Sequence, residues 1–352
     1  MKTKPLHRLI ALSLLLVALP AQADDAEDAQ RLLVVPFPIT EPAVGEGLLA
    51  GLVWMRDGPP LVEGPRKPQA FGAGALYTNG GSRGVLAFDH RAWSEGRWRT
   101  TVIAGIVDVH LKRASLVPGR GELAGFNVEA SGASISAQRG FTGGNSVIVR
   151  LFNAETELAV GGRVPDGVLE DLGSDVVSGL SLGWARDTRD DLFSPTRGSV
   201  ASLIATSQSE NLGGSFDARS LSLKWMGYRS LGPGYVGLHA LFDASGGNPP
   251  FYLRPFVSLR GVAALSYAGE RVVSLETEYR LPIRQRWDVL AFVGAGHVRA
   301  DYRGLEGTSN VQAGGIGVRY RPEQLFGLTF GIDVAQGPDE LATYIQIGNA
   351  WR

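Results

Sequence analysis

The segment Asp108-Val109-His110 has the spacing that best suits acid–base chemistry in this sequence. Residues two apart share one face of an extended strand, so the carboxylate could orient the imidazole for proton transfer during hydrolysis. A protease built on this pair also needs two neighbouring aspartates, and no Asp-x-Asp sequence occurs in the chain. None of the five histidines stands in a His-x-Ser pair, which a serine nucleophile and its base would require. We therefore expect no enzyme, and keep a surface protease as an alternative.

A second group of carboxylates lies in DTRDDLFSPTRGS, residues 187–199. Asp187, Asp190 and Asp191 could offer oxygen ligands to a divalent ion. They alternate with Arg186 and Arg189, and this alternation favours a turn stabilised by its own ion pairs. No Cys is present, which excludes disulfides and thiolate metal sites. We expect no metal and no cofactor.

A third set of charges lies in FVSLRGVAALSYAGERVVSLETEYRLPI, residues 256–283. Its second half alternates, so Glu276, Glu278 and Arg280 share one strand face while apolar residues share the other. In a water-soluble sandwich this polar face would point outward. Arg260-Gly261 lies just upstream, and the fold of the whole chain decides whether Arg260 meets the charged face of this strand.

Alternating segments of about ten to fourteen residues recur along most of the sequence. Glycine-rich turn sequences such as Asn79-Gly80-Gly81 and Gly337-Pro338-Asp339 separate them. Two weaker candidates, 31–38 and 46–56, bring the expected number of strands to sixteen. The others are expected at 69–79, 81–93, 97–111, 122–139, 144–155, 174–187, 198–209, 215–229, 233–243, 269–282, 285–298, 309–321, 325–335 and 340–351.

The first residues predict export from the cytoplasm. A basic start, an apolar run from Leu9 to Leu19 and the sequence Ala21-Gln22-Ala23 are typical of a secretory signal peptide, which we assign to 1–23. The chain has 34 Lys and Arg against 35 Asp and Glu, so no basic field suited to nucleic acid is present. No linker or charge block divides 24–352, which we expect to form one domain.

The length of these segments predicts an all-β, antiparallel transmembrane barrel. Soluble sandwich strands average five or six residues, whereas a tilted membrane strand needs about 9 to 11. An apolar outer face and a polar, glycine-containing inner face are typical of outer-membrane barrels. A soluble periplasmic sandwich or propeller is the alternative. Alternation of short turns with long loops places 244–268, 156–173 and 299–308 outside the cell and the C-terminus in the periplasm.

The chain resembles the BamA/TamA-like outer-membrane assembly and translocation barrels, also called bacterial surface antigen barrels. The turn at 187–199 is similar to an aspartate-rich turn of that family, in which Asp187, Pro195 and Gly198 match the motif. SLRGV, residues 258–262, resembles its V-R-G-F/Y loop motif, and AFVGAGHV with the segment ending at Trp351 resembles its last strands. The resemblance implies that 244–268 folds back into the barrel and that Trp351 belongs to the C-terminal strand.

Carried over from the family, Arg260 would contact an inward-facing carboxylate, for which Glu278 is the expected partner. Gly261 would permit the tight backbone reversal. Gly294 stands where the family often has an Asp, so Glu276 is the expected substitute. The alternative without the resemblance is that Arg260 is a solvated loop residue.

The resemblance implies a role in inserting or translocating polypeptide or lipid, with outer-membrane lipid, lipopolysaccharide and unfolded outer-membrane proteins as partners. The location implied is the outer membrane of a Gram-negative bacterium. The family's periplasmic POTRA domains have no counterpart in the sequence, so we expect no docking module of that type. The alternatives are a passive pore or structural barrel without assembly activity, and an omptin-like surface protease built on Asp108 and His110.

Overall fold

Sixteen antiparallel strands form one sheet in the computed structural model, and each strand pairs with the next along the chain. The structure describes residues 31–56, 69–112, 125–160, 173–247, 249–302, 305–322 and 329–351. The expected signal peptide at 1–23 lies outside these residues. The strands are β1 (Arg31–Glu41), β2 (Gly45–Arg56), β3 (Gln69–Thr78), β4 (Arg83–Trp93), β5 (Trp98–Leu111), β6 (Phe126–Gly140), β7 (Asn145–Val160), β8 (Gly173–Asp187), β9 (Gly198–Gln208), β10 (Ala218–Leu231), β11 (Gly234–Gly247), β12 (Arg271–Arg284), β13 (Trp287–Tyr302), β14 (Leu305–Tyr320), β15 (Phe330–Gln336) and β16 (Leu341–Ile347).

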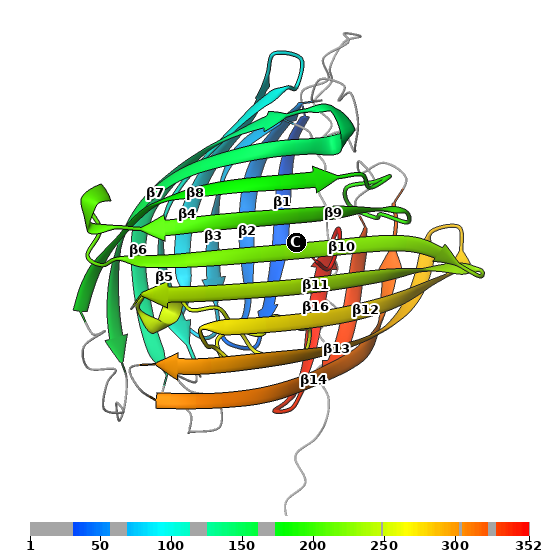
Figure 1. Ribbon diagram of the computed structural model, residues 1–352. Coiled ribbons are helices and arrows are strands. Elements are labelled where there is room, and N and C mark those ends of the chain that lie inside the picture. The colour runs from blue at the N-terminus through cyan, green and yellow to red at the C-terminus, as the bar shows by residue number, and fades with distance from the viewer. Residues whose placement is uncertain are drawn as a thin grey trace, which may run out of the picture.

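The sheet curls into a nearly closed barrel, in which the blue β1 and the red β16 lie side by side (Figure 1). The all-β, sixteen-stranded prediction is therefore confirmed, and five strands follow Arg260-Gly261 as expected. The two weakly patterned segments at the start form the first hairpin, with Leu33 opposite Val53 and Phe37 opposite Leu49. Three short 3₁₀ turns, at Thr142–Gly144, Glu210–Leu212 and Phe251–Leu253, complete the described secondary structure. No helix in the described ranges is long and apolar enough to cross a membrane.

Period-two alternation explains which side chains face outward. In β2 the exposed positions include Leu52 and Trp54, whereas their neighbours are partly buried. The same alternation leaves Val85, Ile106 and Leu182 at least half exposed on the outer wall. The outer surface is consequently apolar over the middle of the strands.

Three expectations about connections need correction. The segment 299–308 is not a long loop, because β13 continues to Tyr302 and β14 begins at Leu305. These strands remain in register to the pair Tyr302 and Leu305, so pairing replaces the expected loop. The segment 156–173 is shorter than expected, since β7 extends to Val160. The long connection after β11 runs from 248 to 270, because β11 reaches Gly247 and β12 begins at Arg271.

The final strand is also shorter than expected. β16 ends at Ile347, so Trp351 is not part of a strand. The cause lies at Gly348, which has a left-handed φ of 78° and whose N–H donates to the carbonyl of Thr329 at 2.6 Å. This conformation turns the chain away from the line of β16. The following residues then lie inside the barrel.

The connection at 248–270, which we term the luminal loop, is packed against the inner wall of the barrel at two places. Phe251 and Leu265 contact Phe126 and Leu158, and the rings of Phe126 and Phe251 meet edge to face at 4.5 Å. The second cluster joins three loop residues to four wall residues, namely Val257, Leu259 and Val262 with Val272, Val298, Val311 and Ala313. Apolar burial on both sides of the loop tip fixes its path.

Candidate functional site

The tip of the luminal loop carries Arg260, whose guanidinium lies among three carboxylates from two strands. Its Nη2 donates to Oε1 of Glu276 at 2.7 Å, and its Nη1 lies 2.7 Å from Oε2 of Glu278. Nη1 also donates to Oδ2 of Asp333 at 2.8 Å. Arg260 is 7% exposed and each of the three acids is less so. The structure thus brings together the predicted Arg260, Glu276 and Glu278, and places Arg260 away from solvent.

Charge within this cluster is balanced by two further arginines. Arg280 donates to Glu278, and Arg319 donates through Nη2 to Oδ2 of Asp333 at 2.8 Å. Both guanidinium groups are at least 97% buried. Three buried arginines therefore face three buried carboxylates, which is the condition under which such charges are tolerated away from water.

Glu276 does more than replace the missing acid at Gly294. Its two oxygens accept from Nε, Nη2 and the backbone N–H of Arg260, at 2.9, 2.7 and 3.1 Å. Gly294 lies directly opposite Glu276, and a Cβ there would stand 2.8 Å from Cδ2 of Leu259. The glycine leaves the space in which Leu259 packs.

Gly261 has a φ of 94°, which an L side chain rarely adopts. Its N–H donates to the Tyr344 hydroxyl of β16 at 3.0 Å. A Cβ on Gly337, in the turn between β15 and β16, would lie 1.8 Å from the carbonyl oxygen of Gly261. The loop tip is therefore seated directly on the last two strands of the barrel.

Trp351 reaches the same cluster from the other direction. Its indole Nε1 donates to Oε1 of Glu276 at 2.6 Å, and its ring stacks on His239 with centroids 5.7 Å apart. Asn349 anchors this segment by donating to the hydroxyl of Tyr228, which packs against Trp351. The indole is 7% exposed, so the segment after Gly348 occupies the interior of the barrel.

Sequence reasoning missed Asp333, Arg319 and the ring of Phe292, whose centroid lies 3.6 Å from the Arg260 guanidinium carbon. The available signal for Asp333 was its position on the polar face of an alternating strand. It lies 73 residues from Arg260 in sequence, and only the closing of the barrel brings them together.

The turn between β8 and β9 contains the predicted Pro195, and the predicted Asp187 and Gly198 are the strand residues on either side of it. Asp187 pairs with Arg189 at 2.7 Å, Pro195 is fully buried, and Gly198 has a φ of 86°. A Cβ at Gly198 would lie 2.2 Å from the carbonyl oxygen of Thr188. Glycine is therefore required where the turn returns to the sheet.

Hydrogen bonds within the turn use the other two aspartates. Asp190 accepts from the hydroxyl and N–H of Thr196 at 2.6 and 2.9 Å, while Asp191 accepts from the Ser194 N–H at 2.7 Å. Partial burial acts to raise the pKa of Asp190, but these bonds and one from Arg197 hold it below its usual value. Among the described residues no group of three or more acidic or histidine side chains is placed to hold a metal ion.

Asp108 and His110 lie 3.0 Å apart, and Asp108 also contacts Arg83 at 3.3 Å. They share the exposed face of β5 with Ile106, which is the outer wall. The barrel wall thus separates Asp108 and His110 from the buried charges around Arg260.

A cavity of about 590 Å³, with both polar and apolar side chains in its lining, lies between the luminal loop and the wall formed by β10 and β11. Lys224, His239 and Asp243 line one side, and Tyr344 and Gln346 of β16 line another. The cavity also reaches Glu41 at the end of β1. It therefore borders both strands at which the sheet begins and ends.

Comparison with known proteins supports the fold. No protein-family model matches the sequence, and no curated protein does either. The structure is similar to BamA from Haemophilus ducreyi lacking POTRA domains 1–3, with a TM-score of 0.64, 14% identity, and coverage of 91% of this chain and 70% of that one. It is also similar to CdiB from Acinetobacter baumannii and from Escherichia coli, with TM-scores of 0.58 and 0.57 and identities of 13% and 12%. In both cases 92% of this chain is covered, and it spans 60% and 62% of the respective CdiB chains. The class of protein defined by the fold is thus the sixteen-stranded barrel that BamA and CdiB share.

Proposed function

We propose that this protein is an integral outer-membrane barrel of the BamA/TamA-like superfamily in a Gram-negative bacterium. We further propose that it inserts or translocates polypeptide or lipid at the junction of its first and last strands. Three features support the proposal, namely the apolar outer wall, the likeness of fold to BamA and CdiB, and the construction of that junction. The partners in this proposal are outer-membrane lipid, lipopolysaccharide and unfolded barrel proteins.

The junction between β1 and β16 is the observation that carries the mechanism. β1 has 11 residues and β16 has 7, so they differ in length at this edge. The Ile345 N–H donates to a side chain there, Oγ1 of Thr40, at 3.2 Å. The sheet order begins at β1 and ends at β16. Such an edge is suited to accepting a client strand by β-augmentation.

The interior beside the junction supports the same mechanism. The cavity of about 590 Å³ reaches the polar side chains of Glu41 of β1 and Gln346 of β16. A polar segment of a client would find hydrogen-bonding partners there, while its apolar face would meet lipid outside. The function needs no catalytic group, and the pair Asp108 and His110 lies on the outer wall.

A reversible disulfide across the junction tests this function. Thr40→Cys with Ile345→Cys places one thiol on each strand of the junction, at the point where the Ile345 N–H lies 3.2 Å from Oγ1 of Thr40. We expect the oxidised protein to lose assembly of a client barrel in proteoliposomes, and the reduced protein to regain it. The matched control is Leu33→Cys with Val53→Cys, which lie opposite each other in the first hairpin.

Equal client assembly by the oxidised and reduced junction mutants would overturn lateral opening. Steady conductance without any client assembly would instead support a passive pore. Recovery of the protein in the soluble periplasmic fraction would overturn the membrane location.

A further inference from the structure

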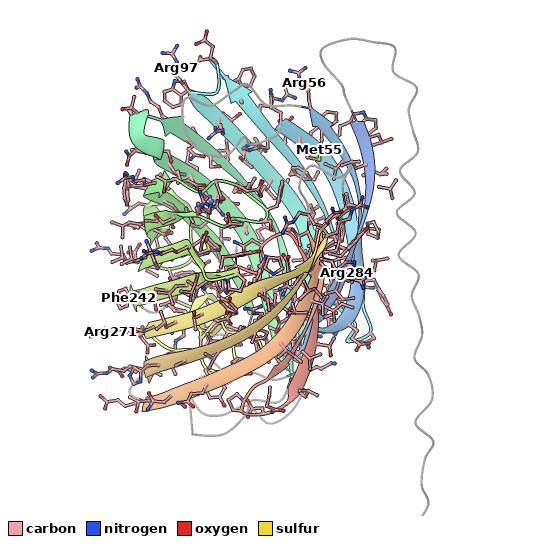
Figure 2. All side chains as sticks on the ribbon, turned by 90° about the vertical axis from the view of Figure 1, so that its right-hand side faces the viewer. Met55, Arg56, Arg97, Phe242, Arg271 and Arg284 are labelled. Atoms are coloured by element: carbon pink, nitrogen blue, oxygen red, sulfur yellow. The ribbon has the colours of Figure 1, made fainter. Side chains whose placement is uncertain are left out.

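Charged side chains lie at both ends of the outer wall of the barrel, and exposed arginines occur at each end. At the end of the long connections, Asp108, Glu129 and Glu157 occupy facing positions on β5, β6 and β7. At the end of the short turns, exposed arginines recur on successive hairpins, and Figure 2 shows Arg56 and Arg97 there at one end of the barrel. The exposed arginines of this end include Arg56, Arg91, Arg97, Arg139, Arg186, Arg197, Arg229 and Arg284.

Exposed aromatic rings accompany these arginines. Trp54 precedes Arg56 by two residues on β2, and Trp184 precedes Arg186 in the same way on β8. Arg139 lies over the rings of Trp98 and Phe141, with its guanidinium carbon 5.4 and 5.3 Å from their centroids. Aromatic rings favour the boundary between hydrocarbon and headgroups, and arginines beyond them reach the level of phosphates.

A cavity of about 250 Å³ lies within this end of the wall, on β2, β3 and β4. Its apolar floor is formed by Trp54 and Phe71, whose rings are stacked with centroids 5.6 Å apart and planes 1° from parallel. Arg56 lies opposite Gln69, and this pair is two residues beyond the pair Trp54 and Phe71 along the strands. The polar side chains that line the cavity include Arg56, Gln69, Asp89 and Arg91.

The charges of this cavity are unequal. Asp89 is engaged by Arg91, whose Nε and Nη2 donate to it at 2.8 and 2.7 Å. No ion pair to Arg56 is found among the described residues, so its charge has no described counterpart. The lining therefore has one positive charge in excess. Since Asp89 already binds a guanidinium, it is poorly available to the ammonium of a zwitterionic headgroup.

We propose that this cavity binds the headgroup of an anionic phospholipid, with the phosphodiester on Arg56 and Arg91 and the start of the acyl chains on Trp54 and Phe71. A guanidinium is matched to phosphate by its planar set of donors. The apolar floor continues along the outer wall through Leu52 and Ala73, which a soluble phosphate would not use. An amphiphile is the ligand that can contact both the two guanidinium groups and the apolar floor. The inference rests on the proposed membrane location, and it adds a lipid site that lateral opening does not require.

Native mass spectrometry of the purified barrel, with short-chain phosphatidylglycerol or phosphatidylcholine as the probe, tests this site. We expect retention of phosphatidylglycerol by the wild type, and about tenfold weaker retention by Arg56→Gln, which corresponds to the loss of one charge-assisted contact. Trp54→Ala should also weaken retention, because it removes half of the stacked floor. Arg229→Gln is the matched control, since it removes an exposed arginine at the same end of the barrel but outside the cavity.

Soluble glycerol phosphate distinguishes a lipid site from a phosphate site. It should fail to displace phosphatidylglycerol, and equal competition would overturn the lipid assignment. Equal retention of the two lipids, or equal effects of Arg56→Gln and Arg229→Gln, would overturn the cavity as the site. Heat-modifiable gel mobility and insertion into vesicles are measured in parallel. Failure of the wild type to insert would count against the proposed membrane function, whereas insertion without lipid selectivity would count only against this site.

Discussion

The indole of Trp351 and the carboxylate of Glu276 are joined by a 2.6 Å hydrogen bond, and the accepting oxygen is the one that also receives Nη2 of Arg260. One carboxylate therefore links the luminal loop to the segment after the last strand. Because Glu276 is 2% exposed, water cannot replace either donor.

Replacement of Trp351 by Phe should lower the stability of the barrel. The ring would keep much of its packing against His239 and Tyr228 but lose the donor to Glu276. A hydrogen bond to a buried charge contributes about 1.5 to 3 kcal/mol, and we expect a loss of this size in thermal or denaturant unfolding. Trp225→Phe on the outer wall should unfold as the wild type does, and an equal effect of the two changes would refute the special role of Trp351.

Replacement of Arg260 by Ala should cost about 3 to 5 kcal/mol, because it leaves Glu276 buried without its guanidinium partner, whereas Asp333 keeps Arg319. Arg260→Lys should recover only part of this loss, since an ammonium cannot reproduce the planar contacts. A double-mutant cycle with Glu276→Gln should show coupling of about 0.5 to 3 kcal/mol. The control cycle pairs Arg260→Ala with Glu270→Gln, because Glu270 pairs with Arg254 instead. Additivity in the first cycle would contradict the contact.

Gly337→Ala should displace the loop tip. Its new methyl group would lie 1.8 Å from the Gly261 carbonyl oxygen, a backbone atom that cannot rotate away. We expect a lower unfolding temperature and faster proteolysis within 248–270. Gly246→Ala is the matched control, since a Cβ there meets nothing within 4 Å. Wild-type proteolysis of Gly337→Ala would show that the loop is not seated on the turn between β15 and β16.

Acid should loosen the turn between β8 and β9. The pKa of Asp190 is lower in the folded turn than its usual value of 3.8, so the stabilisation is complete above that value and is lost as the pH falls through the lowered pKa. Hydrogen exchange at the Thr196 and Arg197 amides should thus show protection that is constant from about pH 7 to 5 and declines below about pH 4. In Asp190→Asn the decline should be absent. A decline that persists unchanged in this variant would assign it to another group.

The sequence was sufficient to predict the number and order of strands, because alternation and strand length are local properties. Most boundaries were correct to a few residues, including the weak first hairpin. The sequence did not predict the structure at 299–308, because pairing of β13 with β14 extends beyond the alternating segment. The turn at Gly348 was missed because the residues that hold it, Thr329 and Tyr228, are distant in sequence.

In the candidate site, too, local patterns predicted some residues and contacts between distant segments supplied the others. The loop motif and the charged face of β12 identified Arg260, Glu276 and Glu278 as residues to consider together. Asp333 and Trp351 join them only because closure of the barrel brings the last strands beside the luminal loop, and no local sequence pattern encodes this closure. Gly294 looked like a missing acid, whereas in the structure it makes room for Leu259.

The shared carboxylate of Glu276 also constrains the order of assembly. Arg260 precedes it in the chain, but Asp333 and Trp351 are supplied by β15 and by the residues after β16, so the cluster is complete only when the last hairpin is in place. A chain arrested before that point would hold an unfinished set of buried charges and a luminal loop without its seat at Gly337. Docking of the luminal loop and closure of the barrel are then a single late event in folding. An exposed loop would mark an incomplete barrel for proteolysis, and a folded one would be spared.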